Sequence, residues 1–108
     1  MGKSLETSRE ELQSKLEAFL GSRNVYFDPP ESIRMKYPAI TYDLYRLNQR
    51  FADNKPYRSL PCYMVTIIDR ESNFDWVKDM LDTFEYCALD RIYNADNLTH
   101  YSFVLYYL

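Results

Sequence analysis

Glycine is scarce in this chain of 108 residues and occurs only at positions 2 and 21. Because phosphate-binding loops need several glycines, whose backbones approach the phosphates closely, the sequence excludes Rossmann-type and P-loop nucleotide sites. No run approaches the roughly 20 apolar residues that a membrane-spanning helix needs. The segment 1–6 also lacks the apolar core of a signal peptide. We therefore expect a cytosolic product without membrane contacts.

The residues that most often bind metals or catalyse reactions are also few: two cysteines, Cys62 and Cys87, and one histidine, His100. They lie 25 and 13 residues apart and form none of the paired spacings that chelate zinc. We expect both cysteines to be buried thiols, His100 to be structural, and the protein to hold no metal and no cofactor. Since no motif places a nucleophile beside a base, the sequence predicts no catalytic residue and a protein that is not an enzyme.

Charge of one sign does not dominate, because 13 Lys and Arg stand against 16 Asp and Glu, for a net charge of -3. This balance argues against a nucleic-acid backbone as the main ligand. The acidic residues Glu10 and Glu11, and the set Asp75, Asp79 and Asp82, fit helix capping and a solvated face better than catalytic carboxylate pairs. Aromatic residues are abundant, with 11 Tyr and 6 Phe, which suits half-buried sheet positions or protein contact surfaces.

Two helices are predicted from apolar residues at helical spacing. The first covers 8–20, because Ser8 and Glu11 form a capping box and Gly21 follows where a left-handed residue ends a helix. The second lies around 74–81, with an apolar face made of Trp76, Val77, Met80, Leu81 and Phe84.

The strands are predicted from β-branched and aromatic runs. Segments 39–47 and 62–69 are expected to pair antiparallel, whereas 24–27 is at most an edge strand because two prolines follow it. Segments 86–93 and 99–108 flank an Asn- and Asp-rich turn and predict a second hairpin. The very apolar last segment must lie inside the sheet or against a partner.

These elements predict an α+β fold, an antiparallel β-sheet with two helices packed on one face. Residues 8–108 form a single domain, and residues 1–7 form a flexible leader. Within 39–47, alternation places Ile40, Tyr42 and Leu44 on one face, and Thr41, Asp43 and Tyr45 on the opposite face.

The polar stretch 48–59 between the first two long strands is predicted to be a long loop and is the best candidate docking element. Its basic residues alternate with aromatic ones, and its composition favours contact with a protein over contact with nucleic acid. A mobile hairpin tip is the alternative interpretation. The candidate partner-binding residues are Arg50, Phe51, Asn54, Lys55, Tyr57 and Arg58.

Five segments carry a family resemblance that extends over most of the chain: Leu20–Ser32, Met35–Tyr42, Ala52–Tyr57, Tyr63–Asp69 and Ala95–Leu98. They resemble small tail-assembly proteins of tailed bacteriophages, most of all the tail-terminator or tail-completion class. The resemblance implies a structural subunit with an α+β fold that assembles as a homo-oligomeric ring, a hexamer, and caps the tail tube beneath the head. It also implies contacts with tail-tube and head-tail connector proteins, and a location in the virion tail, or in the host cytoplasm during assembly.

Other functions stay open at this point. The resembling motifs also fit a head-tail connector or a tail-tube subunit. An unrelated adaptor or a small-ligand-binding domain, with tyrosines lining a cleft between sheet and helices, is a further alternative. We expect no specific nucleic-acid binding, since an acidic ring lumen suits the passage of DNA better than its retention.

Overall fold

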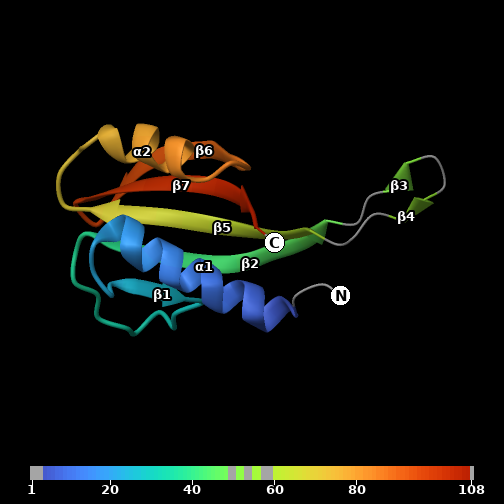
Figure 1. Cartoon of the computed structure of the whole chain (residues 1–108). Coiled ribbons are helices and arrows are strands. Elements are labelled where there is room, and N and C mark those ends of the chain that lie inside the picture. The colour runs from blue at the N-terminus through green and yellow to red at the C-terminus, as the bar shows by residue number, and fades with distance from the viewer. Residues whose placement is uncertain (1–3, 49–50, 53–54, 57–59, 108) are drawn as a thin grey trace.

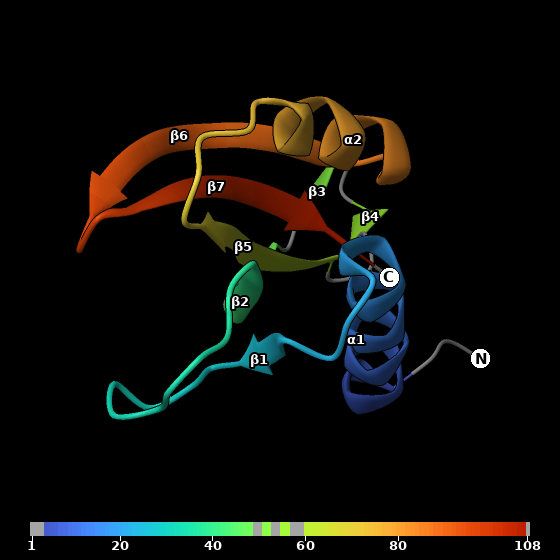
Figure 2. The same cartoon turned by 90° about the vertical axis from the view of Figure 1, so that its left-hand side faces the viewer.

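The computed structural model describes residues 4–48, 51–52, 55–56 and 60–107. The elements are α1 (Leu5–Leu20), β1 (Val25–Phe27), β2 (Ala39–Asn48), β3 (Phe51–Ala52), β4 (Lys55–Pro56), β5 (Leu60–Asp69), α2 (Asp75–Thr83), β6 (Cys87–Ala95) and β7 (Leu98–Tyr106). Five strands form one sheet in the order β1-β2-β5-β7-β6, and β3 pairs with β4 separately. Both helices lie on one face of the large sheet (Figure 1 and Figure 2). The predicted α+β fold is therefore confirmed.

Helix α1 begins earlier than the sequence predicted. Ser4 is its N-cap, and the Ser4 hydroxyl accepts a hydrogen bond at 3.1 Å from the backbone N–H three residues later. The predicted cap, Ser8, is instead buried within the helix, because it continues the row of Leu12 and Leu16 that faces the sheet. The predicted helix end is correct, since Gly21 has a left-handed φ of 82°.

The central hairpin of the sheet is the predicted one. Strands β2 and β5 pair antiparallel along their whole length, from Ala39 opposite Ile68 to Asn48 opposite Leu60. Strand β1 is an edge strand, as predicted, but it runs parallel to β2 instead of antiparallel. The connection 28–38 returns the chain to the end of the sheet where β1 began, and such a return makes neighbouring strands parallel.

Both helices bury apolar residues against the same face of the sheet. Phe19 joins the helices, because its ring centroid lies 5.8 Å from that of Trp76 and 6.3 Å from that of Phe84. Leu81 was predicted on the buried face of α2 but is 41% exposed, because α2 lies at the margin of the sheet and only the row through Met80 and Phe84 faces the core (Figure 2). The fully buried core side chains include Leu12, Leu16, Ile40, Tyr42, Val65, Ile67, Met80, Tyr101 and Phe103.

Strands β6 and β7 form the predicted second hairpin with a tighter turn than expected. Only Asp96 and Asn97 lie between the strands, and both have positive φ, 54° and 63°. Two consecutive left-handed residues are typical of the hairpin turn whose twist matches that of the strands. Strand β7 lies between β5 and β6, so the apolar last strand is inside the sheet, one of the two locations predicted for it.

The hairpin of β2 and β5 extends beyond the rest of the sheet at one end (Figure 1). Strand β5 pairs with β2 from Leu60 onward, but with β7 only from Cys62 onward. The ladder of β3 and β4 lies beyond this end (Figure 1). Within the described part of the chain, no helix is long and apolar enough to cross a bilayer.

Candidate functional site

The predicted docking element lies largely beyond what the structure describes. Of its six candidate residues, Arg50, Asn54, Tyr57 and Arg58 are outside the described residues. The backbones of Phe51 and Lys55 belong to β3 and β4, which pair antiparallel, so the segment predicted as a loop contains a short ladder. The docking role of these six residues stays a prediction.

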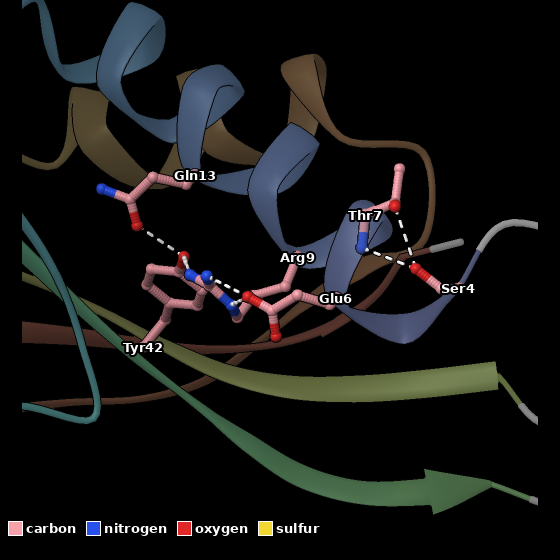
Figure 3. Close-up of polar contacts among 6 residues, drawn as sticks. All are labelled: Ser4, Glu6, Thr7, Arg9, Gln13 and Tyr42. Carbon is pink, nitrogen blue, oxygen red and sulfur yellow. Dashed lines mark hydrogen bonds and ion pairs between the residues drawn. The ribbon is translucent and has the colours of Figure 1, made fainter.

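A polar network lies where α1 passes over β2 (Figure 3). Arg9 pairs with Glu6 one turn earlier in α1 and donates to the Tyr42 hydroxyl at 3.4 Å. The Tyr42 hydroxyl donates to the amide oxygen of Gln13, and the Gln13 amide nitrogen donates to the Val25 carbonyl oxygen at 3.0 Å. The network therefore ties α1 to both β1 and β2.

A second buried tyrosine, Tyr63, stands next to Tyr42 with ring centroids 6.0 Å apart. The Tyr63 hydroxyl has no hydrogen-bond partner among the described residues. Burial raises the pKa of Tyr42 and of Tyr63, because an apolar environment disfavours the charged phenolate, while the hydrogen bond from Arg9 opposes this for Tyr42. Both phenols are therefore neutral at physiological pH.

The cysteines and the histidine are separate structural features. Cys62 is buried as predicted, whereas Cys87 is only half-buried, because it lies in the edge strand β6. Burial raises the pKa of the Cys87 thiol to about 11, which disfavours the nucleophilic thiolate. His100 stacks on Tyr93 with ring centroids 4.7 Å apart, and the Arg91 guanidinium carbon lies 4.6 Å from the centre of the Tyr93 ring.

The acidic residues that the sequence singled out on both helices are exposed. On α2, Asp75, Asp79 and Asp82 form the predicted solvated face, and Lys78 pairs with Asp82 at 2.7 Å. Glu10 and Glu11 were predicted to cap α1, but the earlier start of the helix places them beyond its first turn, which holds Glu6. Among residues with a described position, no three His, Cys, Asp or Glu side chains gather in an arrangement suited to a metal ion.

A cavity of about 290 Å³ lies between α1, the end of α2 and the end of β7. Three tyrosines contribute to its wall, and the Lys15 ammonium nitrogen lies 5.3 Å from the centre of the Tyr107 ring. Its volume is near the lower limit of about 300 Å³ for small-molecule pockets. It is lined by Lys15, Thr83, Phe84, Glu85, Tyr86, Leu105, Tyr106 and Tyr107.

One edge of the sheet is the outer side of β2 over 43–48, which we call the distal β2 edge. Strand β1 covers β2 only from Ile40 to Tyr42, and no described strand pairs with the outer side of β2 after that point. Leu44 lies on the helix-covered face at this edge and is 39% exposed. An irregularity in the pairing between Leu44 and Arg46 marks a bulge.

The opposite edge of the sheet is the outer side of β6, which we call the β6 edge. Leu89 and Ile92 lie on its helix-covered face, opposite Phe103 and Tyr101, and are 39% and 38% exposed. The pairing has an irregularity between Leu89 and Arg91, so this edge also contains a bulge. Phe74, just before α2, and Leu81, within α2, are exposed as well. The two edges therefore resemble each other in having an exposed leucine beside a bulge.

The helix-free face of the sheet, which we call the open face, has opposite charges at the two edges. Asp43 lies on this face at the distal β2 edge, and its pKa is raised by burial and by the neighbouring Asp28 carboxyl. Arg91 lies on the same face at the β6 edge, in line with Ser102 and Thr66. In the described part of the structure, no cation pairs with Asp28 or Asp43, and no carboxylate pairs with Arg91.

The sequence did not lead us to predict that the distal β2 edge and the β6 edge form two exposed surfaces at opposite sides of the sheet. It identified the residues of both strands, but their positions at opposite ends of the sheet follow from the strand order. The architecture defined by the structure is an α+β sheet with two chemically different open edges. No protein-family model matches the sequence, and a search of curated proteins finds no significant match.

Proposed function

We propose that this chain is a structural subunit of a bacteriophage tail, of the tail-terminator or tail-completion class. In this role, copies form a ring that caps the tail tube and joins it to the head. The observation that carries the proposal is the pair of different open edges, because a subunit with two non-equivalent surfaces can repeat head to tail and close into a ring. The motif resemblance described above supports the phage tail as the setting.

The projecting end of the β2–β5 hairpin supports contact with a second kind of partner. A ring subunit needs surfaces for its neighbours and a separate element for the tube or the connector. The hairpin end lies at one end of the strands, whereas the two edges run along their sides (Figure 1). It carries the predicted docking residues, and Phe51→Ala with Tyr57→Ala should leave the fold intact and impair the joining of tube and head.

The chemistry of the described residues fits a binding role. Burial keeps the Cys87 thiol protonated, His100 packs against Tyr93, and the buried phenols of Tyr42 and Tyr63 are neutral. These features support a non-enzymatic role, and in the proposed function that role is carried out in the virion tail and, during assembly, in the host cytoplasm.

The small-ligand alternative rests on the cavity beside Lys15 and Tyr107. A ligand site there predicts a monomer whose thermal stability rises with a ligand, whereas the tail role predicts self-association. A connector or tail-tube subunit also self-associates, so these alternatives are separated by the defect that loss of the protein causes.

Deletion of the gene from the phage genome that encodes it tests the proposal. Without a terminator, heads and tails should remain separate and many tubes should be overlong, because an uncapped tube continues to grow. Electron microscopy of lysates measures both effects, and a plasmid copy of the gene is the control. Tubes of normal length that lack heads would favour a connector, absent tubes would favour a tube subunit, and intact virions would exclude a role in the tail.

A further inference from the structure

We infer that the β6 edge of one copy docks on the distal β2 edge of a second copy, so that the sheet continues from subunit to subunit. The inference deepens the proposed function and depends on it for its biological setting. It names the two surfaces of the ring joint, which are the outer side of β6 (Cys87–Ala95) and the outer side of β2 over 43–48.

Strand direction makes this contact antiparallel. Each of the pairs β2·β5, β5·β7 and β7·β6 is antiparallel, so β6 runs opposite to β2 within one chain. In a second copy placed beside the first, with its strands pointing the same way, β6 is therefore antiparallel to β2 of the first copy. A rotation about an axis parallel to the strands relates the two copies and preserves these strand directions. Antiparallel pairing needs no crossover and adds backbone hydrogen bonds between the two edges.

The same placement brings together the apolar side chains of the two edges. Leu44 and Leu89 lie on the helix-covered face of their strands, and each is 39% exposed in the single chain. Sheet continuation keeps this face continuous from copy to copy. The two leucines are then buried against the neighbouring subunit, and cross-strand apolar pairs of this kind stabilise sheets.

Charges on the open face are complementary between the two edges. Asp43 and the adjacent Asp28 concentrate negative charge at the distal β2 edge, and Arg91 presents positive charge at the β6 edge. These groups have no oppositely charged partner among the described residues of their own chain. Docking places Arg91 beside the two carboxylates, and such pairing selects the partner edge and its register.

Other parts of the edges are protected, which restricts where a strand can add. At β1, the Val25 carbonyl already accepts a hydrogen bond from Gln13 of α1, and Asp28 turns the chain away with a φ of 44° before two prolines. The bulges in β2 and β6 lie within the two docking segments themselves, where they set the local twist of each edge. The incoming β6 edge is therefore directed to 43–48.

Disulfide trapping tests the contact directly. Leu44→Cys and Leu89→Cys are introduced together in a Cys87→Ala background, and the protein is oxidised without other virion proteins. Within one chain the two positions are three strand spacings apart, about 14 Å at about 4.8 Å each. That separation exceeds the limit of about 7 Å between the Cα atoms of a disulfide, so a cross-link must join two copies.

The matched controls are the two variants that each carry only one of the introduced cysteines in the same background, in which the buried native Cys62 remains. The double variant should give a ladder of dimers, trimers and larger species on a non-reducing gel. Each single variant should stay monomeric, and an equimolar mixture of the two should stop at dimers. A double variant that stays monomeric overturns the inference, as does a single variant that dimerises as efficiently as the mixture, because that result indicates symmetric pairing of like edges.

Charge reversal provides an independent measurement on the otherwise unchanged chain. Arg91→Glu should weaken self-association about tenfold in sedimentation velocity across a concentration series, because it places like charges together. Asp43→Arg combined with Arg91→Glu should restore most of the association. Lys36→Glu, the same charge change at an exposed position in the 28–38 connection, should have no effect. Equal effects of Arg91→Glu and Lys36→Glu contradict the pairing.

The outcomes separate this inference from the proposed function. A tail defect in the gene deletion, without cross-linking of the double variant, leaves the phage role standing and removes the edge contact. Cross-linking with intact virions in the deletion removes the phage role and leaves a subunit that self-assembles through these two edges.

Discussion

Two adjacent buried tyrosines provide a matched test of how polar groups contribute to this fold. Tyr42 and Tyr63 lie on neighbouring strands, both almost completely buried. The Tyr42 hydroxyl donates to Gln13 and accepts from Arg9, whereas the Tyr63 hydroxyl has no partner among the described residues. The same substitution, Tyr to Phe, therefore removes a bonded oxygen at one position and an unbonded oxygen at the other.

The expected effects differ in sign. Tyr42→Phe should lower the free energy of unfolding by about 1–3 kcal/mol, because it breaks two hydrogen bonds and leaves the part-buried Gln13 oxygen without its donor. Tyr63→Phe should leave that free energy unchanged or raise it by up to about 1 kcal/mol, because the buried hydroxyl was desolvated without gaining a bond.

Urea unfolding followed by circular dichroism measures both changes, and thermal unfolding checks them. A change of 1 kcal/mol shifts the midpoint by about 4–8 °C in a domain of this size. The double variant should show the sum of the two effects to within about 0.5 kcal/mol if the tyrosines act independently. Equal destabilisation by the two single substitutions would refute the reasoning, because both substitutions keep the ring, and equal costs would mean that the bonded and the unbonded hydroxyl contribute equally.

The remaining predictions concern pH, a thiol and a helix end. Because the pKa of Tyr42 and Tyr63 is raised, the unfolded chain ionises first as pH rises past about 10, so the free energy of unfolding should fall above that pH in urea titrations. A Cys87 thiol with a pKa of about 11 instead of 9.0 should react with iodoacetamide about 100-fold more slowly at neutral pH than the urea-unfolded thiol, as measured by mass spectrometry. Gly21→Ala should cost about 1–2 kcal/mol in urea unfolding and Gly21→Asn less, since φ is 82° and the strain is in the backbone alone.

Much of the fold was predictable because local patterns and tertiary packing agree. The alternation in 39–47 correctly placed Ile40 and Tyr42 on one face of the strand, the face that the structure buries. The apolar last strand lies inside the sheet, which is one of the two locations expected for it. The start of α1 was misplaced because Ser8 with Glu11 imitates a capping box. The competing signal was the spacing of Ser8, Leu12 and Leu16, which forms one buried row of a longer helix.

The candidate surfaces were less predictable because they depend on strand order. The sequence does not state that β1 runs parallel to β2 and ends after three residues, which leaves the rest of β2 uncovered. The sequence likewise gives no reason to expect Leu89 and Ile92 to be exposed, since an apolar strand residue fits either a central or an edge position. Only the assembled sheet places Asp43 and Arg91 on one face at opposite edges.

The difference between the two edges of the sheet has a genetic consequence. In the proposed ring, a copy that carries Arg91→Glu still receives a neighbour on its β2 side but binds the next copy about tenfold more weakly, so it interrupts a growing arc. In a mixture of normal and altered copies, the fraction of rings built entirely from normal copies equals the fraction of normal copies raised to the power of the number of subunits in the ring. Expression of this variant beside the normal gene should therefore lower the yield of closed rings by more than the share of altered subunits.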